Sequence, residues 1–236
     1  MAAGITRTLY PFKFMSNQTN DNLRENLRAR SKRADERLKF LWLPGRRSEL
    51  AAESYDLGYS WREQGETGLA ARSFQRAVEA FEGKSPRKTK ASLKSFMVVA
   101  SCQNHIGLIH LDANGDSDAI LWFDRAIELR RELQQLFPDN RENQIYLGGA
   151  LCNRAWASKS TDRRIATAFF EQSLSELRQS EKTCECSYWD EKRKSWWCDQ
   201  LEVLGRTAGL AWVDMAPMFI DNAQSGLDSI KSEIDF

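Results

Sequence analysis

The sequence is poor in the residues that break helices and in those that build metal sites. It has five prolines and thirteen glycines in 236 residues, with five cysteines and only two histidines. Scarce proline and glycine favour helices over a turn-rich β-structure. The two histidines, His105 and His110, are five residues apart, so on a helix they point to different sides and do not form an i, i+4 metal-binding pair.

Long hydrophobic runs are also missing. The longest apolar stretch, FMVVA at 96–100, is far shorter than the roughly 20 residues that a membrane-spanning helix needs. The first twenty residues lack the uninterrupted apolar core of a secretory signal. Hydrophobic residues make up 42% of the chain and charged residues 28%, which is typical of a globular protein. We therefore expect a cytoplasmic protein that does not enter the membrane.

A large net charge of one sign is absent, because the formal charge is +1. The charge is nevertheless distributed unevenly: residues 24–47 hold nine Lys and Arg against three acidic residues, 84–94 are basic, and 214–236 are acidic. These segments are either solvated helix faces or a basic end that meets an acidic partner or a phosphate backbone. Nucleic-acid binding through the two basic segments is the less favoured of these alternatives.

Motifs for catalysis are missing as well. Gly83-Lys84-Ser85 resembles the end of a phosphate-binding loop, but Val78 stands where the first glycine belongs and no strand precedes it. Neither G-x-G-x-x-G nor G-x-S-x-G occurs. We therefore expect no enzymatic activity and no cofactor; an enzyme built on helical repeats is the alternative, without an acid–base group to support it.

Three cysteines lie close together in CECSYWDEKRKSWWC, at Cys184, Cys186 and Cys198. Their C-x-C spacing with one distant third cysteine is not the pattern of a four-ligand zinc site. A reducing cytoplasm disfavours a disulfide. We expect no metal site here and interpret these cysteines as buried packing residues.

The informative feature is an internal repeat. The stretch DAILWFDRAIEL (118–129) aligns with LAARSFQRAVEAF (69–81), and two further copies follow at similar spacing. In each copy a small residue is followed by a large one after four positions and by another small one after three more. These positions are Ala70, Phe74 and Ala77; Ala119, Phe123 and Ala126; Ala166, Phe170 and Ser173; and Ala216, Ile220 and Ala223.

A leucine- or isoleucine-glycine pair precedes the first two copies. Gly58 lies twelve residues before Ala70, and Gly107 lies twelve residues before Ala119. Two antiparallel helices that approach closely need small side chains at the contact and a large one beside it. The spacing therefore predicts helical hairpins that bury their apolar sides by stacking on one another.

This pattern resembles the tetratricopeptide repeat, in a form with units about fifteen residues longer than the usual ~34. It is similar to long-unit bacterial arrays such as those attached to kinase domains in planctomycetes. The resemblance covers residues 48–230 and implies an all-α, right-handed α-solenoid with long helices. The third and fourth copies depart from it, because Arg154 stands in place of the first-helix glycine and Gly205 is one residue out of frame.

The expected organisation has four segments. Residues 1–20 form an irregular arm, 21–45 a charged helix and linker, 46–230 a repeat domain of about four hairpins, and 231–236 a tail.

The resemblance also implies a function: a protein- or peptide-binding scaffold in which the first helix of each hairpin lines a concave groove. The groove residues that it implies are Tyr55, Tyr59, Arg62, Ser101, Asn104, His105, Leu108, Asn153 and Arg154. Asparagine and arginine side chains suit a peptide backbone or a carboxylate. Two alternatives remain: these residues simply face water, or the repeats form a regulatory domain that binds a small ligand or a partner helix.

Overall fold

The computed structural model describes residues 20–41, 45–182 and 212–233. This part contains eight α-helices, one short 3-10 helix and no β-strand, which confirms the all-α prediction for the described residues. The helices are α1 (Asn20–Arg37), η2 (Leu38–Phe40), α2 (Arg46–Glu63), α3 (Thr67–Glu79), α4 (Lys90–Asp112), α5 (Asp116–Leu136), α6 (Arg141–Ser158), α7 (Arg163–Lys182) and α9 (Trp212–Ser232).

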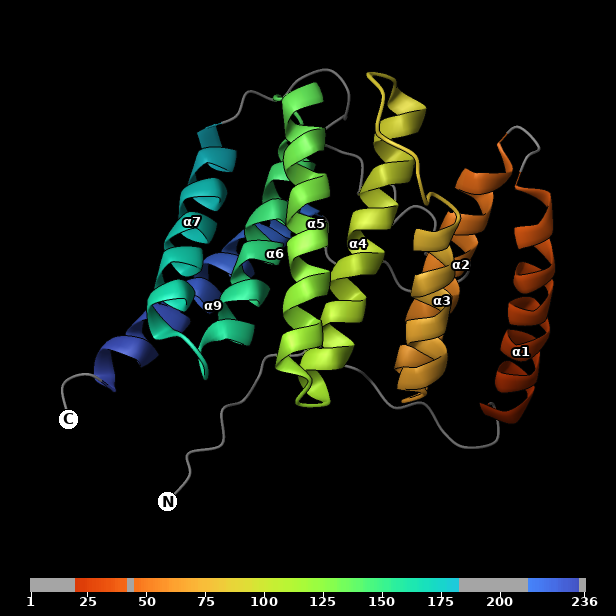
Figure 1. The fold of residues 1–236 in the computed structure, drawn as a ribbon, viewed down its shortest axis with the longest axis horizontal. Helices are drawn as coiled ribbons and strands as arrows, with labels where there is room; N and C mark the ends of the chain where they lie inside the picture. Colours follow the sequence, from red (N-terminus) through yellow and green to blue (C-terminus); the bar gives the residue numbers. More distant parts are fainter. Residues whose placement is uncertain (1–19, 42–44, 183–211, 234–236) are drawn as a thin grey trace.

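Helices that follow one another in the sequence pack side by side (Figure 1). Three antiparallel hairpins result, α2 with α3, α4 with α5 and α6 with α7, and they contact one another through α3–α4 and α5–α6. The first helices also touch, α2 with α4 and α4 with α6. Stacking therefore buries the apolar side that each hairpin would expose alone.

Short turns and side-chain caps determine where the helices begin and end. Gly65 (φ 75°) and Asn114 (φ 60°) provide the left-handed residues that follow α2 and α4. The Asn140 side chain accepts a bond from Asn143 N (2.7 Å) and so caps α6. Because each turn is short, the two helices of a hairpin are neighbours in space.

Close helix contact within the first two hairpins depends on glycine facing phenylalanine. A Cβ added at Gly58 would lie 2.5 Å from the Phe74 ring, and one added at Gly107 would lie 2.6 Å from the Phe123 ring. Both rings are fully buried. The missing side chain therefore lets the phenylalanine ring sit against the backbone of the first helix.

Replacing Gly58 with alanine tests this contact. The new methyl group overlaps the Phe74 ring, so we expect the free energy of unfolding to fall by about 1–3 kcal/mol even though alanine favours helices. Urea denaturation followed by circular dichroism measures the change. Gly68→Ala is the control, because no atom lies within 4 Å of that position in α3 and the substitution should be neutral or stabilising. Equal effects of the two substitutions would contradict the packing argument.

The third hairpin is built differently. Phe170 on α7 packs against Gly226 of α9, where an added Cβ would lie 2.2 Å from the ring. On α6, Gly148 faces Leu177 and Gly149 faces Phe219 of α9. Helix α9 therefore packs directly on α6 and α7.

The predicted small residues of the last copy, Ala216 and Ala223, are buried on α9, and Ile220 is half-buried. Ala223 belongs to the same hydrophobic cluster as Ala166 and Phe170. The first helix expected for that copy falls in residues 183–211, which lie outside the described part. The described residues therefore show one helix of the expected fourth hairpin.

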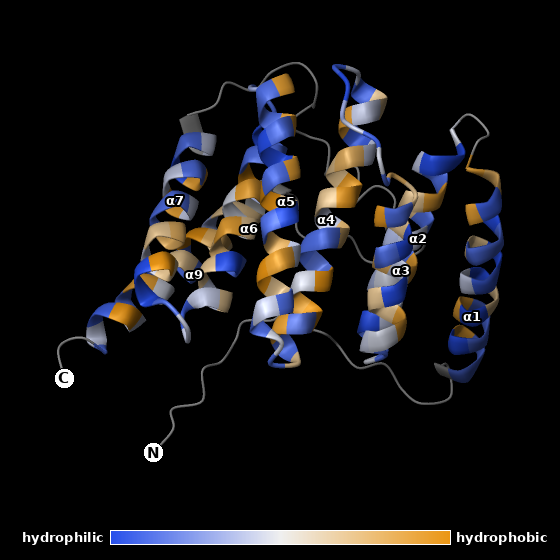
Figure 2. Ribbon diagram, in the orientation of Figure 1, coloured by the Kyte–Doolittle hydropathy of each residue, from blue (hydrophilic) through white to orange (hydrophobic). Residues whose placement is uncertain are grey.

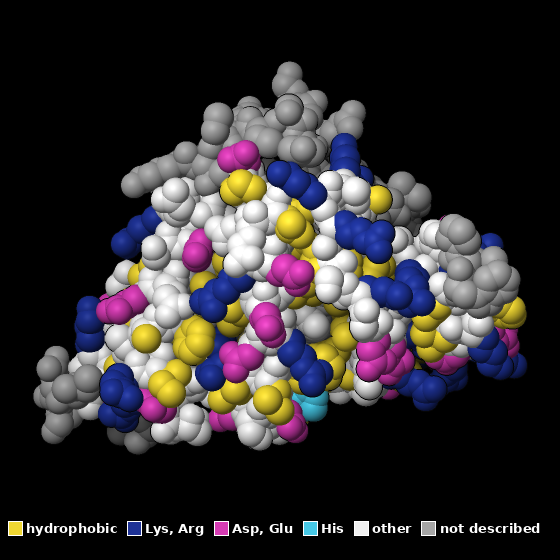
Figure 3. All heavy atoms as spheres, turned by 45° about the horizontal axis from the view of Figure 1, so that its top comes forward, with side chains coloured by type: hydrophobic (Ala, Val, Ile, Leu, Met, Phe, Trp, Pro, Cys, Tyr) yellow, Lys and Arg dark blue, Asp and Glu magenta, His cyan; other side chains and the backbone are white. Residues whose placement is uncertain are grey.

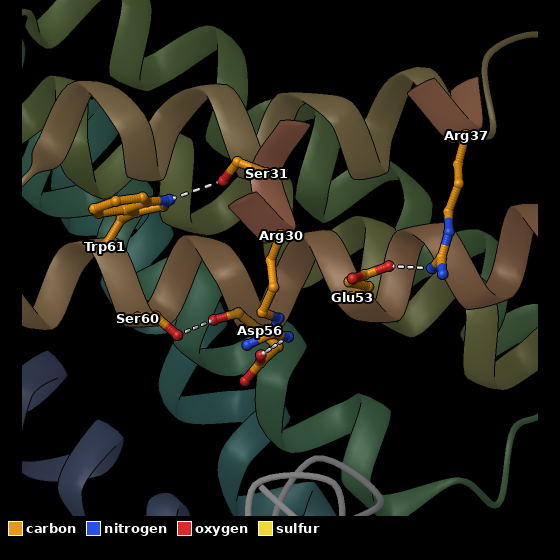
Figure 4. Close-up of polar contacts among 7 residues, drawn as sticks. All are labelled: Arg30, Ser31, Arg37, Glu53, Asp56, Ser60 and Trp61. Carbon is orange, nitrogen blue, oxygen red and sulfur yellow. Dashed lines mark hydrogen bonds and ion pairs between the residues drawn. The ribbon is translucent and has the colours of Figure 1, made fainter. Parts of the chain in front are cut away.

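Helix α1 is packed against the first hairpin. Its Leu27 and Ala34 are buried in the same hydrophobic cluster as Leu57 and Phe74. On the α3 side, Asp35 accepts two bonds from the buried Arg76 guanidinium. On the α2 side, three polar contacts are seen in Figure 4: Arg30 with Asp56 (2.7 Å), Trp61 Nε1 with Ser31 Oγ (3.1 Å), and Arg37 with Glu53. Helix α1 therefore packs on the first hairpin through two buried apolar residues and several polar contacts.

Hydrophobic residues are distributed unevenly among the helices (Figure 2). Helix α1, at one end, is mostly hydrophilic, whereas α6 and α9 carry more hydrophobic residues. No helix in the described part of the chain has an apolar stretch long enough to span a lipid bilayer.

Candidate interaction surface

Aromatic and histidine side chains meet where α2 packs on α4. The His105 ring stacks on Phe74 (5.0 Å between centroids, 17° between planes) and meets Tyr59 edge-on at 4.9 Å. Arg62 Nη1 donates to His105 Nδ1 at 3.2 Å, and its guanidinium lies 3.6 Å from Asp112. Predicted groove residues of two successive hairpins are therefore in direct contact.

A second contact continues this line from α4 to α6. Asn153 Nδ2 of α6 donates to Asn104 Oδ1 of α4 at 3.0 Å, although the two residues are 49 positions apart in sequence. Asn104, Asn153 and the neighbouring Leu108 are half-buried. Arg62 is half-buried as well. We call the uncharged half-buried predicted residues of the three first helices the first-helix strip: Tyr55, Tyr59, Asn104, Leu108 and Asn153.

Three of the predicted groove residues are buried: Ser101, His105 and Arg154. His105 is 5% exposed and Ser101 is 8% exposed, so neither presents its side chain to a partner. Burial lowers the pKa of His105 well below its usual value, and the charges of Arg62 and Arg130 lower it further. The imidazole therefore stays neutral at neutral pH and accepts from Arg62. His105, which was predicted to line the groove, instead packs its ring against Phe74 and Tyr59.

Arg154, which was also predicted to line the groove, is 9% exposed and contacts residues of two second helices. Its Nε donates to Asp124 Oδ1 of α5 at 2.7 Å, and its guanidinium lies 4.8 Å above the Phe169 ring of α7. Successive residues of an α-helix are turned by about 100°. Arg154, one residue after Asn153, therefore points to the second-helix side.

A buried arginine that the repeat pattern did not single out lies at the centre of the molecule. Arg130 of α5 is 2% exposed; it donates to Ser101 Oγ (2.9 Å) and Asn143 Oδ1 (3.3 Å), and it lies over the Tyr146 ring. Burial lowers its pKa to about 10, so it stays charged at neutral pH. Its position four residues after the buried Ala126 places a charge on the apolar face of the helix, which is the sequence signal for it.

Arg130 connects the layers that carry the strip. Asn143 returns a bond from its Nδ2 to the backbone oxygen of Arg130 (2.9 Å), and Glu142, 1% exposed, lies close enough to influence the arginine electrostatically. The side chain thus joins α4, α5 and α6. This network positions Ser101 and the residues around it.

Two surface hollows lie away from the strip. One, of about 570 Å³, runs between α5 and α7, and the other, of about 620 Å³, lies along α9. The first is lined by Asp124, Ile127, Glu128, Arg131, Glu132, Gln135 and Phe169, and the second by Asp221, Gln224, Ser225, Asp228, Ser229 and Ser232. Neither contains a strip residue.

The described residues hold no cluster of three or more His, Cys, Asp or Glu side chains that could bind a metal ion. Cys102 and Cys152 are buried free thiols, and burial raises the pKa of Cys152 to about 12 and that of Cys102 well above its usual value. Both therefore stay protonated and are poor nucleophiles at neutral pH. Cys184, Cys186 and Cys198 lie outside the described residues.

The strip consists of two aromatic rings, two amides and one aliphatic side chain, and contacts between successive hairpins hold it. Comparison with known proteins adds no family to this description. The sequence matches no protein-family model and no curated protein, and the fold matches no solved structure.

Proposed function

We propose that this protein is a binding scaffold for another protein or a peptide, and that the first-helix strip is its contact surface. The observation that carries the proposal is that contacts between successive hairpins hold the strip residues: Tyr59 packs on the buried His105 ring at 4.9 Å, and Asn104 bonds Asn153 at 3.0 Å. Three successive hairpins thus contribute to one surface. Half-buried tyrosine and asparagine side chains supply apolar area and hydrogen bonds without a large loss of conformational entropy.

The proposal includes an architecture. We infer that the stacked hairpins form a right-handed α-solenoid of the tetratricopeptide type, with the strip on its inner face. The glycine–phenylalanine contacts at Gly58 and Gly107 support this inference, because the same spacing recurs in both hairpins. A regulatory role or a small ligand stays a prediction from the sequence.

Loss of partner binding by a strip variant is the expected result. Tyr55→Ala with Asn104→Ala removes an aromatic ring and an amide from the strip. We expect proteins captured by the wild-type chain to bind the double variant at least about tenfold more weakly, because hot-spot truncations cost about 1.4 kcal/mol or more. Quantitative mass spectrometry of captured proteins, followed by a dissociation constant for the purified partner, measures the effect.

The matched control is Gln75→Ala with Leu121→Ala, two exposed residues on second helices. It should retain the partner. Circular dichroism of both variants checks that the helices persist. Equal capture by the wild type, the strip variant and the control would contradict the proposal that the strip is the contact surface.

A further inference from the structure

The structure brings the last two residues of the first basic segment, Arg46 and Arg47, to the same end of the molecule as the second basic segment. The end of α3 and the starts of α2 and α4 meet there. Arg47 Nη1 donates to the backbone oxygen of Ala80 at 2.6 Å, which joins α2 to α3. Ser48 Oγ and Ser95 Oγ are 2.8 Å apart, which joins α2 to α4. Basic residues about forty positions apart in the sequence thus become neighbours.

We call the exposed basic side chains of this region the basic end: Arg46, Lys84, Arg87, Lys88 and Lys90. Figure 3, in which this end comes forward, shows dark blue side chains on it. Within the described part of the chain Lys84, Lys88 and Lys90 form no ion pair. The exposed carboxylates nearby are Glu49, which pairs with Arg46, and Glu79 and Glu82. Cations therefore exceed anions here, although the whole chain is close to neutral.

The kind of partner follows from what the basic end contains. Its members are charged side chains: Arg46 and Lys90 at the starts of α2 and α4, and Lys84, Arg87 and Lys88 in the segment between α3 and α4. Protein and peptide partners usually need a buried aromatic or aliphatic anchor. Single strands are held largely by stacking on aromatic rings. Positively charged side chains alone are sufficient to bind the rows of phosphates on a duplex.

We propose that the basic end binds the phosphate backbone of double-stranded nucleic acid, independently of base sequence. The positive ends of the α2 and α4 dipoles add to the attraction, because both helices begin here and α4 has no acidic residue in its first turn. The basic end and the first-helix strip share no residue. An experiment can therefore contradict duplex binding without contradicting partner binding, and the reverse.

Fluorescence anisotropy with a labelled DNA duplex and an RNA duplex of random sequence tests the proposal on the full chain. Each neutralised phosphate contributes about 0.9 to the slope of log affinity against log salt, so five cations predict a loss on the order of 500-fold between about 50 and 200 mM salt. Lys84→Glu with Lys88→Glu and Lys90→Glu should weaken binding at least about tenfold at the lower salt. Glutamate at position 90 suits the first turn of α4, so the helix should persist.

The control carries the same change in net charge at exposed sites elsewhere: Arg164→Glu, Arg178→Glu and Lys231→Glu. It should bind the duplex like the wild type. Equal losses in the two triple variants, a flat salt response, or tighter binding of single strands or of polyglutamate would overturn the proposal. If circular dichroism showed unfolding of the glutamate variant, glutamine at the same three lysines would provide the comparison.

Discussion

Replacing Phe123 with alanine should lower the free energy of unfolding by about 3–5 kcal/mol. The ring is fully buried and lies against Gly107, whose missing side chain leaves nothing to fill the space that the ring would vacate. The loss therefore combines the lost burial of apolar surface with the cost of a cavity between α4 and α5. Urea denaturation followed by far-ultraviolet circular dichroism measures it.

Leu121→Ala is the control for this substitution, two residues earlier on the same helix. Leu121 is 59% exposed, so its truncation should change the free energy of unfolding by no more than about 0.5 kcal/mol. Similar losses for the two variants would mean that the hairpin contact does not depend on the aromatic ring.

Replacing Arg130 with alanine should cost about 3 kcal/mol or more. The substitution leaves the buried Ser101 hydroxyl and Asn143 amide without their partner, removes a charge close to the buried Glu142, and opens a cavity between helices α4, α5 and α6. Thermal and urea unfolding of the purified variant measure the change.

Two further variants separate the causes. Arg130→Met keeps much of the side-chain volume and should lose less stability than alanine, because only the polar contacts disappear. Arg131→Ala, at the exposed neighbouring position, should change the free energy of unfolding by about 0.5 kcal/mol at most. If alanine at 130 were as harmless as at 131, the network around Arg130 would have no structural role.

Contacts inside a hairpin could be predicted from the sequence. Gly58 and Phe74 are sixteen residues apart, as are Gly107 and Phe123, and both pairs are in contact. A short turn makes the two helices neighbours, so one spacing suffices to bring the residues together. Helix type and order follow from the same periodicity.

Contacts between hairpins could not be predicted in this way. Phe170 has the same spacing as Phe74 and Phe123, yet its glycine partner, Gly226, lies on α9, 56 residues later. Arg154 stands where the repeat pattern expects glycine, and it reaches Asp124 on another hairpin. Such partners depend on how far each hairpin is rotated and shifted on the next, and no local spacing encodes that.

The same distinction applies to the candidate surfaces. The sequence by itself determined that the described part of the chain is helical and which residues meet inside the first two hairpins, because these depend on local spacing and short turns. Only the tertiary structure decided that Ser101 and His105 are buried while Asn104 and Asn153 meet, and that Arg46 lies at the same end as the basic residues 84–90. Exposure and charge density depend on which helices lie beside one another, and that requires the packed chain.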